Sequence, residues 1–171
     1  MKPSVQQNNW IENVIKNRGM RSIYVYVRRQ SSQAFDAENP IRKGGPSIVI
    51  HPAGCPKISE SLLRLDNNSI IKISFKGPSS GNLTLSLTHR SRVSGTTLTM
   101  KVAQTSDILE LPIPSESSLT LDDITFYPRP SGWPSFEPNE ENDLTIRVNS
   151  RLWDYFIQDI KLRDEKGTPL L

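Results

Sequence analysis

The segment 127–136, which reads YPRPSGWPSF, combines aromatic side chains with proline in a way that suits ligand binding. Tyr127, Trp133 and Phe136 lie among three prolines, which restrict the backbone and so lower the entropy lost when a ring is ordered against a ligand. An exposed aromatic ring can stack on the C–H face of a sugar. Arg129 adds a guanidinium that can donate paired hydrogen bonds to neighbouring hydroxyls or to a carboxylate. Burial of Trp133 against an open end of the core is the alternative.

Residues that could support catalysis are few and badly placed for it. His51 and Cys55 lie close in sequence, but a proline and a glycine between them prevent a helix that would align a thiolate with an imidazole. Asp122 and Asp123 are adjacent, and adjacent residues of a strand point to opposite faces of its sheet. We therefore predict a protein that is not an enzyme by itself, although the chain could belong to a larger enzyme.

The charge of the chain gives little support for a nucleic-acid partner. Its 171 residues include 21 Lys and Arg against 18 Asp and Glu, for a formal net charge of +3. The basic segment 89–92, HRSR, has no interleaved aromatic residues of the kind that stack on bases, so we predict a solvated hairpin tip there. The acidic segment 137–143 fits a cation site or, as such runs more often do, a solvated loop. The sequence disfavours nucleic acid as a partner.

Strands must position these residues, because apolar and polar side chains alternate along most of the chain. In 69–76, for example, Ile71, Ile73 and Phe75 mark one face. One buried and one solvated face is typical of antiparallel sheets, and without helices to form crossovers two such sheets must pack face to face. We predict an all-β fold, a two-sheet antiparallel β-sandwich of jelly-roll topology. About nine strands are predicted, at 22–28, 47–51, 69–76, 82–88, 96–103, 108–113, 119–126, 143–149 and 153–163.

The length fits one domain over 1–171. The spacing of apolar residues predicts one short helix at 10–18, within an N-terminal cap at 1–20. The segment 164–171 is expected to be a tail that is frayed or leads into a neighbouring domain. No apolar stretch is long enough for a membrane span, and one cysteine leaves no intrachain disulfide. The first residues lack the apolar region of a signal peptide, so we expect a cytoplasmic protein if the chain is complete and an extracellular one if it is a fragment of a secreted protein.

The segment 155–162, YFIQDIKL, resembles the closing strand of galactose-binding-like jelly-roll domains, which include many carbohydrate-binding modules. Those strands often begin with an aromatic pair and alternate aliphatic with polar or acidic residues, and 144–149 resembles the strand before it. The resemblance implies the same fold, and it places Asp159 at an acidic position that often contributes to a structural calcium site. The sequence departs from the family pattern in its N-terminal part, where Asp36 and Glu38 are candidate ligands only by their charge. Ca²⁺ needs six to eight oxygens, so one carboxylate does not make a site. A hydrogen-bonded strand carboxylate without metal is the alternative for Asp159.

We therefore predict a noncatalytic carbohydrate-binding β-sandwich, with Tyr127, Arg129, Trp133 and Phe136 as ligand-binding residues and no cofactor. A structural calcium ion at Asp159 is the alternative to a metal-free fold. Weak affinity at such a site becomes useful through tethering or multivalency. The alternative is a protein–protein interaction module, in which the helix and the aromatic loop dock onto a partner subunit or a neighbouring domain. The fold alone does not separate these functions.

Overall fold

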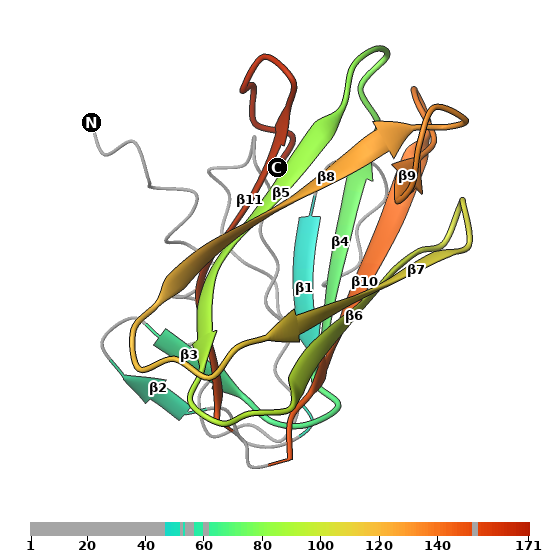
Figure 1. Ribbon diagram of the computed structural model, residues 1–171. Coiled ribbons are helices and arrows are strands. Elements are labelled where there is room, and N and C mark those ends of the chain that lie inside the picture. The colour runs from blue at the N-terminus through green and yellow to red at the C-terminus, as the bar shows by residue number, and fades with distance from the viewer. Residues whose placement is uncertain (1–46, 52, 54–56, 60–61, 152–153) are drawn as a thin grey trace.

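The structure, a computed structural model, describes residues 47–51, 53, 57–59, 62–151 and 154–171, and this part of the chain is all-β (Figure 1). A five-stranded sheet has the order β1 (Ser47–His51), β4 (Ile70–Lys76), β10 (Glu141–Asn149), β6 (Thr96–Val102) and β7 (Asp107–Ile113). A six-stranded sheet has the order β2 (Lys57–Ser59), β3 (Leu62–Leu65), β11 (Tyr155–Asp164), β5 (Leu83–Ser91), β8 (Thr120–Pro128) and β9 (Ser135–Phe136). Within the described ranges no helix is long and apolar enough to cross a bilayer.

The predicted two-sheet antiparallel sandwich is confirmed. The strand pairs are antiparallel apart from β8 with β9, which run parallel. The chain passes repeatedly from one sheet to the other, for example from β4 to β5 and back to β6 (Figure 1), as in a jelly roll. A bulge interrupts the pairing of β11 with β5 between Ile157 and Asp159.

The core lies between the two sheets and is built from the alternating side chains. In β4, Ile71, Ile73 and Phe75 are buried while Lys72 is exposed, as the alternation predicts. The inward residues of β5, β6, β10 and β11 meet them in one apolar cluster, whose burial is the main force holding the sheets together. Among its members are Leu83, Leu85, Leu87, Leu98, Met100, Val102, Leu144, Ile146, Val148, Tyr155, Ile157, Ile160 and Leu162.

Every predicted strand that falls within the described residues is present, and the differences lie at strand ends and in short strands. The predicted strand 22–28 and helix 10–18 lie outside the described residues. The predicted hairpin tip at 89–92 is wrong, because β5 continues through His89 and Arg90 to Ser91. The short strands β2, β3 and β9 were not predicted, since two to four residues show too little periodicity.

The sequence predicts a frayed tail at 164–171, but the structure shows an ordered segment. It turns back along β11, where the Leu170 amide donates to the Leu162 carbonyl at 2.8 Å. The side chains of Leu170 and Leu171 pack against the core. This segment and the β4–β5 turn lie at the same end of the sandwich as the loop between β8 and β9 (Figure 1).

Candidate functional site

The β8–β9 loop, residues 129–134, carries two of the predicted ligand-binding residues, Arg129 and Trp133, and is closed by backbone hydrogen bonds. The Tyr127 amide donates to the Pro134 carbonyl, and the Arg129 amide donates to the Phe136 carbonyl, each at 2.9 Å. The two strands that flank the loop are therefore tied together at its base, and the chain between them projects from the end of the sandwich (Figure 1).

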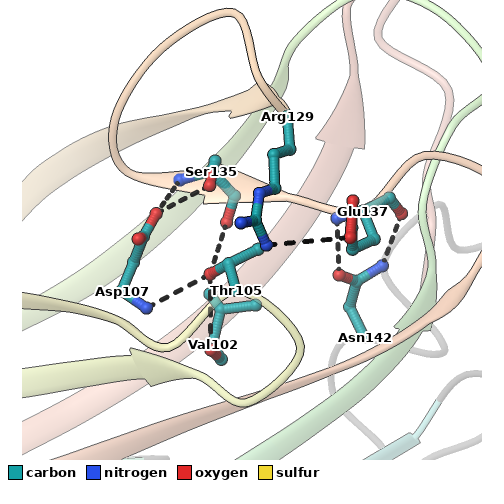
Figure 2. Close-up of polar contacts among 7 residues, drawn as sticks. All are labelled: Val102, Thr105, Asp107, Arg129, Ser135, Glu137 and Asn142. Carbon is teal, nitrogen blue, oxygen red and sulfur yellow. Dashed lines mark hydrogen bonds and ion pairs between the residues drawn. The ribbon is translucent and has the colours of Figure 1, made fainter.

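A second anchor joins this loop to the turn between β6 and β7 (Figure 2). The Asp107 carboxylate accepts from the Ser135 amide at 2.8 Å and from the Ser135 hydroxyl at 2.7 Å. The Thr105 hydroxyl accepts from the Asp107 amide at 3.2 Å and lies 3.4 Å from the carbonyl oxygens of Val102 and Ser135. Hydrogen bonds to a charged acceptor are stronger than neutral ones, so the end of the loop is held firmly.

The segment that follows β9 is anchored by a buried asparagine. The Asn142 side chain accepts from the Glu137 amide and donates to the carbonyls of Glu137 and Glu140, all at 2.9 Å. Asn142 is fully buried. Gly77 lies against this segment, and a Cβ at that position would collide with the Glu137 carbonyl oxygen. The close approach requires glycine at position 77.

Three of the predicted ligand-binding residues remain accessible, two of them on this loop and Tyr127 on β8 just before it. Trp133 is 56% exposed, so the alternative in which its ring fills the open end of the core is wrong. The Arg129 guanidinium is about half exposed, and its Nη1 lies 3.9 Å from Oε2 of Glu137 (Figure 2). Tyr127 is half-buried, with its ring packed against Gly132, where a Cβ would come within 2.8 Å of the ring.

Phe136 does not belong to this accessible set, contrary to the sequence prediction. Its side chain is 0% exposed and is part of the apolar core. Pairing of β9 with β8 places Phe136 beside Pro128. The Phe136 ring, rather than that of Trp133, packs into the core at this end of the sandwich. A fully buried ring offers no face to a ligand, so Phe136 is a structural residue.

The sequence alone does not single out Glu137 as a neighbour of Arg129. It stands at the start of the acidic segment 137–143 and was grouped there with solvated loop residues. The structure places its carboxylate beside Arg129, and its side chain is 33% exposed. Its position directly after the aromatic segment was the only available signal.

Asp159, the predicted calcium ligand, lies on β11 beside a lysine. Its carboxylate accepts from the Ile160 amide at 2.9 Å and lies 3.6 Å from Nζ of Lys161. Burial raises the pKa of Asp159, because desolvation disfavours the charged form. The described residues contain no cluster of three or more His, Cys, Asp or Glu side chains that could hold a metal ion. Asp36 and Glu38 lie outside the described ranges, so a calcium ion at Asp159 stays a prediction.

A hydrogen-bonded chain of three polar side chains lies inside the sandwich. The imidazole of His89 on β5 lies 2.8 Å, through Nδ1, from the Tyr155 hydroxyl on β11. Its Nε2 lies 2.6 Å from Oδ2 of Asp122 on β8. Burial lowers the pKa of His89 and raises the pKa of Tyr155. A neutral imidazole then donates from Nε2 to the carboxylate and accepts the Tyr155 proton at Nδ1.

This chain resembles a catalytic relay in its order but not in its accessibility. His89 and Tyr155 are both 0% exposed, and only Asp122 reaches solvent. A substrate cannot approach either buried group, so the network is structural. Asp123, adjacent to Asp122, points to the other face and accepts from the Ser86 hydroxyl at 2.6 Å, as the alternation predicts.

The sequence contains two other patterns that are typical of catalytic sites. The turn 77–81 reads GPSSG, which matches the G-x-S-x-G pattern of hydrolases. It connects β4 to β5, however, and the hydrolase pattern requires a strand followed by a helix. His51 is described at the end of β1, whereas Cys55 lies outside the described residues.

Solved structures similar to this chain are carbohydrate-binding modules. The C-terminal CBM6 of LamC, a marine laminarinase from Zobellia galactanivorans, is 18% identical, with a TM-score of 0.42 over 69% of this chain and 80% of that one. A module of Cellvibrio mixtus lichenase 5A in complex with cellotriose is 13% identical, with a TM-score of 0.41 over 86% and 91%. A family 35 module from an environmental isolate is 15% identical, with a TM-score of 0.45 over 88% and 97%.

No protein-family model matches the chain, and no curated protein matches it either. The similarity to solved structures concerns the fold alone, since the identities are low. The candidate site consists of the exposed Trp133, the half-buried Tyr127 and the neighbouring pair of Arg129 and Glu137.

Proposed function

We propose that the protein binds carbohydrate through the β8–β9 loop. The observation that carries this proposal is the 56% exposure of Trp133 on a backbone that is hydrogen-bonded at both ends of the loop. Apolar rings of this size are usually withdrawn from water. A ring held in water on a fixed backbone can cover the C–H face of a sugar while losing little conformational entropy.

The side chains near Trp133 have separate roles in this proposal. The indole stacks on the sugar ring, and the Arg129 guanidinium donates hydrogen bonds to hydroxyl oxygens. Tyr127 acts through Gly132, because its ring supports the backbone just before Trp133. One stacking ring and a few hydrogen bonds give weak affinity, which tethering or several binding sites would increase. The protein is noncatalytic in this proposal.

Binding to a glycan array tests the proposal. The wild type, Trp133→Ala and Leu121→Ala are compared, because Leu121 on β8 is 64% exposed and controls for the loss of a large exposed apolar side chain. We expect the wild type and Leu121→Ala to bind the same glycans and Trp133→Ala to lose at least about tenfold in affinity.

Two outcomes would contradict the proposal. The first is a folded Trp133→Ala variant that binds glycans as the wild type does. The second is a wild-type protein that binds no glycan, which would leave the protein-interaction alternative for the same exposed loop.

A further inference from the structure

We propose that Glu137 binds the ligand together with Arg129, and that this pair restricts the site to neutral, hydroxyl-rich sugars. The inference rests on the proposed function, because it concerns the ligand of the same loop. It goes beyond that function by adding a binding residue and by excluding uronic acids and sulfated sugars as the preferred ligands.

The geometry of the pair leaves both side chains free to bind. The distance of 3.9 Å between Arg129 Nη1 and Glu137 Oε2 is longer than the 2.7–2.9 Å of a charge-assisted hydrogen bond. The guanidinium carries five N–H donors and the carboxylate about four acceptor positions. The side chains are 51% and 33% exposed, respectively. Both side chains therefore reach solvent, and the long contact between them leaves donors and acceptors available.

Adjacent sugar hydroxyls complement such a pair. Each hydroxyl has one donor and two acceptor positions, so one can accept from Arg129 while its neighbour donates to Glu137. A carboxylate or sulfate that takes the place of one of these hydroxyls supplies acceptors only, so it could pair with Arg129 but not with Glu137. Figure 2 shows the Arg129 side chain extending from the loop toward Glu137, so that donor and acceptor lie side by side.

The backbone at both residues is fixed before any ligand arrives. Glu137 is held through its amide and carbonyl by the buried Asn142, and Gly77 packs against its carbonyl. The Arg129 amide is bonded to the Phe136 carbonyl. Ordering the pair on binding therefore costs only side-chain freedom.

Charge around the pair disfavours an anionic ligand. Glu137 already lies next to Arg129 and offsets its charge. Asp107, bonded to Ser135, lies on the other side of the loop base (Figure 2). The exposed Glu140 follows Glu137 in the connection between β9 and β10. An acidic sugar at the pair would meet a guanidinium whose charge Glu137 already offsets, and like charges brought together at an interface reduce affinity.

The test is an array that carries neutral, uronate-containing and sulfated glycans, probed with the wild type, Glu137→Gln and Glu116→Gln. We expect the wild type to bind neutral glycans in preference to the anionic ones, with little dependence on salt. Glu137→Gln should bind the neutral glycans about tenfold more weakly, because it loses a charged acceptor. Glu116 is exposed in the β7–β8 connection, and Glu116→Gln makes the same change of charge there without loss of binding.

Stronger wild-type binding of uronates or sulfated glycans would overturn the inference and leave the carbohydrate proposal standing, as would unchanged binding of neutral glycans by Glu137→Gln. Trp133→Ala on the same array separates the two claims, because it should lose every glycan if the loop is the site. Absence of any wild-type binding would overturn both. Equal melting temperatures of wild type and Glu137→Gln exclude misfolding as the cause of a loss.

Discussion

The chain of His89, Tyr155 and Asp122 inside the sandwich and the pair of Arg129 and Glu137 at its end differ in how completely their polar groups are satisfied. The interior chain has contacts of 2.6 and 2.8 Å, and two of its members are fully buried. The pair at the loop has one contact of 3.9 Å, and both members reach solvent. Both regions contain a carboxylate beside a nitrogen-bearing side chain, yet in the interior chain only Asp122 reaches solvent, whereas both members of the loop pair do.

The difference shows why residue type alone is a weak guide to function in this fold. Buried polar groups must be paired inside the protein, because burying an unpaired one destabilises the folded state. Polar groups that are both buried and paired cannot reach a ligand. An exposed pair held at a distance contributes little to stability, and its unused donors and acceptors are available for recognition. Substitutions in the two regions should therefore separate stability from binding.

The largest effect on stability is expected for His89→Ala. It leaves the Tyr155 hydroxyl without its partner and creates a cavity between β5 and β11, so the free energy of unfolding should fall by about 3 kcal/mol. Arg129→Ala serves as the control and should change it by less than about 0.5 kcal/mol. Urea denaturation measures both, and equal effects of the two substitutions would contradict the comparison.

Asp107→Ala should have the next largest effect, because it breaks the anchor of the loop. Both the amide and the hydroxyl of the buried Ser135 would lose their acceptor, which should cost about 1–3 kcal/mol. Glycan affinity should fall as well, since the loop would no longer be held in place. Glu110→Ala, an exposed change on the same strand, is the control for urea denaturation and array binding. Unchanged stability of Asp107→Ala would show that this anchor is not needed.

Acidification should weaken the interior chain. Burial lowers the pKa of His89 below its usual value of 6.5, so the unfolded chain takes up a proton at a higher pH than the folded one. The stability contributed by neutral His89 is complete above about pH 6.5 and is lost as the pH falls below it, by at most about 1.4 kcal/mol per pH unit.

The pH dependence of unfolding in wild type and His89→Gln gives this contribution as a difference. The pKa of His51 is also lowered by burial, but His51 is present in both proteins and cancels. The variant should show the shallower loss of stability between pH 6.5 and lower values. Parallel curves would mean that His89 is not neutral in the folded protein.

The smallest effect is expected for Asp159→Asn. The carboxylate contacts only Lys161 and a neighbouring amide among the described residues, and such pairs contribute less than about 1 kcal/mol. The melting temperature should change little, and EGTA should leave the wild type unaffected. A decrease caused by EGTA in the wild type but not in the variant would instead support calcium at this position.

The fold was more predictable from the sequence than the site because its signal is local. The alternation of Ile71, Ile73 and Phe75 is visible within one strand and dictates which face is buried. Trp133 and Phe136, by contrast, are similar residues in one Pro-rich segment, and only the packing of distant strands decides that one is exposed and the other buried.

The polar contacts depend even more on distant parts of the chain. His89 is 66 residues from Tyr155 and 33 from Asp122, so no local pattern could reveal their hydrogen bonds. Glu137 is near Arg129 in sequence, but their contact depends on the pairing of β8 with β9, a strand too short to predict. Only the register of the folded sheets brings these groups together.

The central claim, that Trp133 is the surface on which a sugar stacks, has a direct test by NMR. The indole N–H signal of Trp133 in the ¹⁵N-labelled protein, assigned by its loss in Trp133→Phe, is followed while the best-bound glycan of the array is added. We expect this signal to shift as glycan is added and the shift to saturate with the same Kd as glycan binding to the whole protein. Saturable glycan binding that leaves the Trp133 signal unmoved would contradict it.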